Sequence, residues 1–203
     1  ETIDGVGEVR LGGRRDRTIR VELLPARMAA LAVTAQDINE AFAKAIADSG
    51  YAGSYRGVYP IKVNQQHQTV ADVVRLGAPF HHGLEAGSKA ELIAALGYLH
   101  DPAAYIICNG YKDAEFIDLA LFSLKMGLQT ILVLEMPGEL DLLLERAAKQ
   151  NIRPRIGIRV KLASSVGGKW AESGGEGSVF GLTPPQVIAA VDRLRELEML
   201  DCL

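Results

Sequence analysis

From residue 57 onward, short apolar runs alternate with amphipathic stretches of helical length. The runs predict strands at residues 57–61, 80–84, 104–108, 130–134 and 155–160. The amphipathic stretches predict helices at residues 67–76, 88–99, 113–126, 138–150 and 184–198. Apolar runs without polar alternation suit strands that are buried on both faces of a parallel sheet. The pattern therefore predicts consecutive βα units and an α/β fold.

The first fifty residues have a different pattern. Residues 9–11 and 18–23 alternate as short strands do, and residues 28–47 are helix formers with Ile38, Phe42 and Ala45 at helical spacing. Gly50 is a stop signal for that helix. We therefore divide the chain into an N-terminal extension with a lead-in helix, residues 1–50, and a βα domain, residues 51–203.

A polar residue comes at or just after the end of each predicted strand. These residues recur every 23 to 26 positions, which is one βα unit per step: Lys62, Glu85, Asn109, Glu135 and Arg159. The carboxyl ends of the strands converge on one mouth in a (β/α)₈ barrel, where active sites lie. An open doubly wound sheet is the alternative, but its Gly-rich phosphate fingerprint is absent after the first strand.

A (β/α)₈ TIM-type barrel is therefore the predicted fold, with about its first five βα units present in the sequence. Because such a barrel takes about 250 residues, we interpret the chain as part of a longer protein.

Lys62 is the first candidate for chemistry. A lysine among apolar neighbours favours the free amine that imine formation needs, although a strand-end lysine also commonly extends to solvent. Glu85 either pairs with that lysine or with another cation of the barrel. Asn109 either donates to a ligand or shapes a turn. Arg159 lies between apolar residues and needs a polar partner, either an anionic ligand atom or a carboxylate such as Glu135.

Composition excludes several other classes. The 203 residues are 48% hydrophobic and carry a net charge of −3, with no basic stripe for nucleic acid or an anionic membrane. No apolar run reaches the length of a membrane span. Two distant cysteines, Cys108 and Cys202, favour a reducing compartment such as the cytoplasm, with a single disulfide between them as the alternative. His81 and His82 lack the spacing of a metal site, so no metal ligand is predicted. The Gly-rich loop at residues 163–181 is interpreted as an ordered lid.

Four motifs in order carry a family resemblance. They are Tyr59-Pro60-Ile61-Lys62-Val63-Asn64-Gln65, Gly83-Leu84-Glu85-Ala86-Gly87-Ser88-Lys89, Ile107-Cys108-Asn109-Gly110-Tyr111-Lys112-Asp113 and Ser173-Gly174-Gly175-Glu176. Together they resemble the biosynthetic arginine decarboxylases, which are long bacterial and plant enzymes of the alanine-racemase-like (fold type III) pyridoxal-phosphate group. The resemblance runs from about Gly50 to the C-terminus.

The resemblance implies a barrel followed by a β-domain, homo-oligomers with active sites between subunits, and association with Mg²⁺. It implies conversion of L-arginine to agmatine and CO₂ with pyridoxal 5′-phosphate, a step towards putrescine. By the same resemblance, Lys62 is the catalytic lysine that carries the cofactor, and Glu85, Asn109 and Arg159 belong to the cofactor site. Val179 stands where the family has a lysine, which affects assembly. Since further site residues would come after Leu203, we expect this piece to be inactive alone.

Three alternatives remain from the sequence. A diaminopimelate or ornithine decarboxylase, or a racemase, would share the fold, although those families favour Tyr-Ala-x-Lys at the lysine. A non-catalytic carrier of pyridoxal phosphate would be a single barrel without a β-domain. A pseudo-enzyme that binds a partner decarboxylase would explain Val179.

Overall fold

The computed structural model describes residues 35–161 and 178–203, and the chain divides into two compact units, residues 1–55 and 56–203. In the first unit, helix α2 (Ala35–Ser49) ends two residues beyond the predicted boundary. The ring of Phe42 on this helix stacks on Tyr55, with centroids 4.0 Å apart. The predicted strands at residues 9–11 and 18–23 lie outside the described residues, as does the predicted start of the helix.

The second unit contains a five-stranded parallel sheet. Its strands are β1 (Val58–Pro60), β2 (Gly83–Ala86), β3 (Tyr105–Cys108), β4 (Gln129–Leu134) and β5 (Ile156–Ile158). Each strand pairs with its neighbour in sequence, so the order across the sheet is β1-β2-β3-β4-β5. This sequential parallel order is that of consecutive units of a (β/α) barrel, which confirms the predicted fold.

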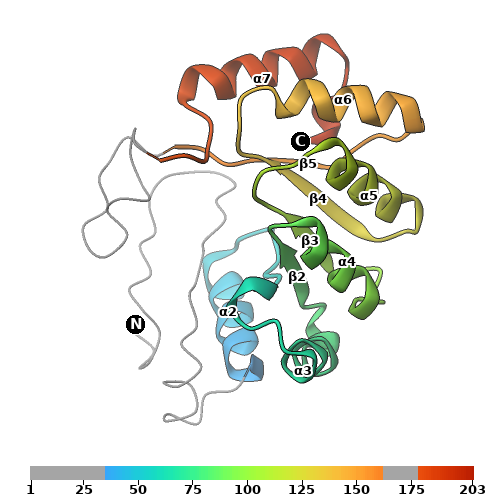
Figure 1. The fold of residues 1–203 in the computed structure, drawn as a ribbon. Coiled ribbons are helices and arrows are strands. Elements are labelled where there is room, and N and C mark those ends of the chain that lie inside the picture. The colour runs from blue at the N-terminus through green and yellow to red at the C-terminus, as the bar shows by residue number, and fades with distance from the viewer. Residues whose placement is uncertain (1–34, 162–177) are drawn as a thin grey trace. The chain divides into compact units, whose positions relative to one another are not determined.

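A helix comes after each strand. These helices are α3 (His67–Gly77), α4 (Lys89–Tyr98), α5 (Ala114–Lys125), α6 (Glu139–Gln150) and α7 (Pro184–Glu196). In Figure 1, α3 to α7 succeed one another along the outer side of the sheet. A doubly wound sheet would instead divide its helices between two faces. Short 3₁₀ turns also occur at Ile61–Val63, Ala78–Phe80 and Leu200–Cys202.

The second strand differs from the prediction. Residues 78–80 form a 3₁₀ turn, and His81 adopts a left-handed conformation with φ of 54°, so the strand begins only at Gly83. Pro79 lacks the N–H that a strand ladder requires, which favours the turn. As a result Glu85 lies inside the strand, opposite Pro60 and Ile107, rather than after its end.

The helix caps show how the loops are fixed. Ser88 accepts a hydrogen bond from the Glu91 amide at the start of α4, and Asp113 accepts one from the Phe116 amide at the start of α5. Ser88 and Glu91 do not form a full capping box, because the Glu91 carboxylate accepts from the amide of Gly87 rather than from that of Ser88. This shift of one residue brings the Gly87 loop against the helix end.

The core lies between the sheet and the outer helices. Strand β2 is buried along its whole length, whereas β3 and β4 alternate between buried and half-buried positions. The prediction that strands are buried on both faces therefore holds for β2 but not for β3 and β4. The largest side chains that are fully buried include Leu84, Ile106, Leu132, Leu92, Phe116 and Leu143.

Replacing Leu132 by alanine should lower the free energy of unfolding by about 2–5 kcal/mol, because it leaves a cavity under β4. The matched control is Leu76→Ala on α3, where the leucine is 58% exposed and the change should stay within about 0.5 kcal/mol. Urea unfolding followed by circular dichroism measures both. Equal losses in the two variants would contradict this position of the core.

Candidate functional site

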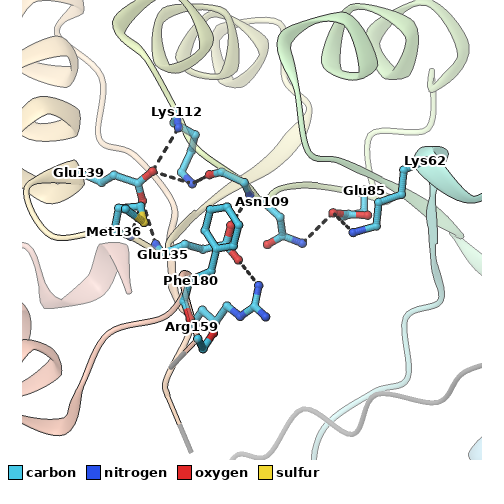
Figure 2. A network of polar contacts seen from close by, with 11 residues as sticks. Lys62, Glu85, Asn109, Lys112, Glu135, Met136, Glu139, Arg159 and Phe180 are labelled. Atoms are coloured by element: carbon cyan, nitrogen blue, oxygen red, sulfur yellow. Dashed lines mark hydrogen bonds and ion pairs between the residues drawn. The ribbon is translucent and has the colours of Figure 1, made fainter. Parts of the chain in front are cut away.

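The sheet brings seven charged or polar side chains together at the carboxyl ends of its strands. Figure 2 shows them as one network from five successive βα units: Lys62, Glu85, Asn109, Lys112, Glu135, Glu139 and Arg159. Five of these residues were predicted from their spacing. The sequential parallel pairing explains the convergence, because it aligns all strand ends along one edge.

Lys62, Glu85 and Asn109 form one side of the network. Lys62 lies on the 3₁₀ turn after β1, and its Nζ is 3.9 Å from Glu85 Oε1. The Asn109 side-chain amide donates to the same oxygen at 3.0 Å. The second oxygen, Glu85 Oε2, is buried and, within the described ranges, is left without a hydrogen-bond partner. A buried acceptor with no donor is unfavourable, and a ligand donor would satisfy it.

The surroundings of Lys62 differ from the sequence prediction. The prediction placed the lysine among apolar neighbours, but its side chain is 58% exposed at the mouth. Of its two apolar neighbours on the 3₁₀ turn, Ile61 is buried in the core and Val63 is 63% exposed, so neither encloses the lysine. Its amine is open to solvent and to an incoming carbonyl group.

Arg159 and Glu135 form the other side of the network. Arg159 Nη1 donates to Glu135 Oε1 at 2.7 Å, which is one of the two kinds of partner that the sequence left open for this guanidinium. Glu135 is almost fully buried, whereas the Arg159 side chain is 45% exposed. The guanidinium also lies over the ring of Phe180, 5.9 Å from its centroid. Arg159 is thus held on two sides and still presents part of its cation to the mouth.

Sequence reasoning did not find Lys112 and Glu139. Their side chains are 2% and 5% exposed, and Lys112 Nζ is 3.2 Å from Glu139 Oε1. Glu139 is the first residue of α6, where an acidic residue is explained by the helix dipole alone. Lys112 stands in a polar loop motif. Neither position carries a sequence signal of burial, because their apolar surroundings come from distant segments.

Two further features define the base of the site. Gly110 has φ of +77°, and a Cβ there would lie 2.5 Å from the Gly87 carbonyl oxygen, so the loops after β2 and β3 meet closely.

Burial raises the pKa of the Cys108 thiol to about 12. The thiol is therefore protonated at neutral pH, which excludes a nucleophilic role for Cys108 there.

Other sequence candidates lie apart from this network or outside the described residues. His81 pairs with Asp101 at 2.8 Å at the opposite ends of the strands. Across residues 35–161 and 178–203, no group of three or more His, Cys, Asp or Glu side chains could hold a metal ion. Most of the predicted lid, including Trp170, falls in the range that is not described. Of the described helices, none has the length and apolar character that crossing a bilayer requires.

Most of the chain matches a known protein family. Residues 35–202 match the family described as "Pyridoxal-dependent decarboxylase, pyridoxal binding domain". The chain belongs to this family, and its fold is that of the fold type III pyridoxal-phosphate decarboxylases.

Among individual proteins, the chain is similar to biosynthetic arginine decarboxylases. The chain is 52% identical over 164 residues to a biosynthetic arginine decarboxylase of Tolumonas auensis, covering 80% of this chain and 26% of that protein. The solved structure of a biosynthetic arginine decarboxylase from Campylobacter jejuni is similar with a TM-score of 0.71 and 37% identity, over 83% of this chain and 27% of that one. A diaminopimelate decarboxylase from M. jannaschi shares the fold, with a TM-score of 0.57 and 20% identity over 79% of this chain and 34% of that one.

The chain thus spans about a quarter of the length of the arginine decarboxylases that it matches.

Gly110→Ala should destabilise the protein more than Gly127→Ala does. Both glycines have positive φ, so each alanine pays a left-handed backbone cost of about 1–2 kcal/mol. Only at Gly110 would the added Cβ also press on a backbone oxygen, whereas at Gly127 it meets open space. Thermal unfolding of the two variants measures the difference. Equal melting temperatures would show that the loops after β2 and β3 do not meet as described.

Proposed function

We propose that the protein to which this chain belongs is a pyridoxal-phosphate-dependent decarboxylase that converts L-arginine to agmatine and CO₂. The observation that carries the proposal is the exposed Lys62 amine beside a buried carboxylate, Glu85, whose second oxygen lacks a donor among the described residues. Family membership supports the cofactor. The similarity to arginine decarboxylases at 37–52% identity supports the substrate, whereas the similarity to a diaminopimelate decarboxylase at 20% supports only the fold.

The residues at the mouth fit the cofactor chemically. An accessible lysine amine can bind an aldehyde covalently, and we assign that role to Lys62. The exposed part of the Arg159 guanidinium offers a polar contact to a ring that carries a hydroxyl group and negative charge, and the buried Glu85 Oε2 is an acceptor without a donor among the described residues. When bound, pyridoxal phosphate supplies the ring system that accepts the electron pair left when CO₂ departs.

Each protein group has a role that agrees with its contacts. Glu85 Oε1 lies 3.9 Å from Lys62 Nζ and orients the lysine amine at the mouth. Asn109 fixes Glu85 Oε1 by its hydrogen bond, while Oε2 has no donor within the described residues and remains for a ligand donor. Arg159 is kept in place by Glu135 and Phe180 and binds an anionic atom with its exposed edge.

The same proposal extends to the organisation of the protein. It includes the division between an N-terminal extension, residues 1–50, and the barrel domain, residues 51–203. It also includes cytoplasmic location and a homo-oligomer with active sites between subunits. Val179, which is 72% exposed, lies where a lysine could otherwise form an ionic contact with another subunit. A requirement for Mg²⁺ is part of the resemblance, but we assign no described residue to it.

Lys62→Met should abolish agmatine formation in the full-length natural protein, because no other residue is assigned to carry the cofactor. The matched control is Lys149→Met on α6, since Lys149 has a nearly equal exposure of 57% and pairs with Glu145 away from the mouth. Borohydride reduction after incubation with pyridoxal phosphate, followed by peptide mass spectrometry, should place the pyridoxyl group on Lys62 in the unmodified protein and the control.

A folded protein with no pyridoxyl group on Lys62 would overturn the proposed cofactor site. Labelling at Lys62 without release of CO₂ from arginine would instead support the non-catalytic carrier. The 203-residue chain alone should form no agmatine in the same assay, since it spans about a quarter of the arginine decarboxylases that it resembles.

A further inference from the structure

Lys112 and Glu139 form a buried ion pair that the proposed chemistry does not use. Their side chains are 2% and 5% exposed, and neither is among the residues assigned to touch the cofactor. Removing two charges from water is costly, and neutral residues often replace such a pair without loss of stability. Stability alone therefore does not explain why Lys112 and Glu139 are both charged and buried.

Glu139 joins the loops that come after β3 and β4. Its Oε1 accepts from the Lys112 backbone amide at 3.2 Å and lies 3.2 Å from Lys112 Nζ. Its Oε2 accepts from the backbone amides of Glu135 and Met136, at 2.8 and 3.1 Å. One carboxylate thus fixes the backbone of Glu135 at the point where β4 ends.

Lys112 fixes the same residue from the other side. Its Nζ donates to the Gly110 carbonyl oxygen at 2.5 Å. The Gly110 amide in turn donates to Glu135 Oε2. The backbone of Glu135 is therefore held by Glu139, and its side chain is held by a glycine that Lys112 positions.

Glu135 connects these buried contacts to Arg159 at the mouth. Its Oε1 accepts from Arg159 at 2.7 Å, and its carbonyl oxygen accepts from the Gly181 amide at 2.8 Å, next to Phe180. Glu135 therefore contacts the Arg159 guanidinium directly, and its carbonyl oxygen also holds the chain beside Phe180, whose ring lies under the same guanidinium. Figure 2 shows the series of contacts from Lys112 through Glu139 and Glu135 to Arg159.

We propose that the Lys112–Glu139 ion pair is a positioning pair that fixes Glu135 and thereby sets the orientation of the Arg159 guanidinium at the mouth. The consequence for catalysis rests on the proposed function, in which Arg159 binds an anionic atom. Lys112 and Glu139 touch neither cofactor nor substrate and act only through Glu135 and Arg159.

The variant for the test replaces both charges, K112M/E139Q. A single replacement would leave an unpaired buried charge and confuse misfolding with loss of position. The glutamine also cannot accept at both ends, because whichever end carries the NH₂ group faces a backbone amide, either that of Lys112 or those of Glu135 and Met136.

The control variant is D118N/R146M, because Asp118 and Arg146 form a different ion pair, between α5 and α6. Arg146 Nε donates to Asp118 Oδ1 at 2.8 Å, and this contact lowers the pKa of Asp118, so the pair is ionised at neutral pH. Asp118 and Arg146 lie on the helices and not in the loops at the mouth. Their loss should leave the mouth unchanged.

The first readout is the Arg159 Nε–H signal in ¹⁵N-arginine-labelled full-length protein, assigned by its disappearance in Arg159→Met. This signal should shift or broaden in K112M/E139Q and stay in place in D118N/R146M, with melting temperature as the test of folding. An unmoved signal in folded K112M/E139Q would overturn the proposal, whether or not the protein is active.

The second readout is kcat/KM for arginine, measured in two backgrounds. K112M/E139Q should lower it about tenfold when Arg159 is present and cause no further loss in an Arg159→Met protein, since residues that act through one another are not additive. Equal losses in both backgrounds would show a merely structural role and overturn the proposal. An unmodified protein that is folded but inactive would overturn the proposed function, while the Arg159 signal would still decide the positioning role.

Discussion

Each strand of the sheet pairs in parallel with the next strand in sequence. Parallel strands require a crossover, and here every crossover returns through a helix to the next position in the sheet. All strands therefore end at the same edge, and the loop after each strand meets the loops after its neighbours. The polar network at the mouth depends on this constraint, because its members come from five βα units.

The carboxylates buried at the mouth each need a nearby cation to offset the cost of leaving water. Glu85, Glu135 and Glu139 are all buried, and each lies beside one cation: Lys62, Arg159 and Lys112, respectively. A buried carboxylate without such a partner would carry a large desolvation cost. The three pairs differ in exposure, however. Lys62 and Arg159 reach the solvent side of the mouth, while Lys112 is enclosed, so the first two can contact a ligand and the third can only support its neighbours.

The sequence predicted the features that depend on local periodicity. Apolar runs and helical stretches indicated the βα units, and the regular spacing of Lys62, Glu85, Asn109, Glu135 and Arg159 indicated their common edge. That Arg159 needs a polar partner was predicted because its guanidinium is set between apolar residues, with Glu135 as one of the two kinds of partner considered. Features that depend on tertiary contacts could not be predicted. Because His81 adopts a left-handed conformation, the second strand begins at Gly83 rather than at residue 80. The exposure of Lys62 depends on the 3₁₀ turn that follows β1.

Lys112 and Glu139 show the physical reason for this limit most clearly. Each lies a few residues beyond a strand end, where a polar side chain ordinarily faces solvent, and local sequence describes only that ordinary case. Their burial arises because the Gly110 loop passes close to the Gly87 loop and α6 begins directly behind Glu135. Closing these loops over the strand ends leaves backbone amides that water cannot reach, and a buried carboxylate is an effective common acceptor for several of them. Once Glu139 fills that role, a buried cation has to accompany it. The ion pair is therefore a consequence of how the loops close, and its effect on Arg159 arises from the same geometry.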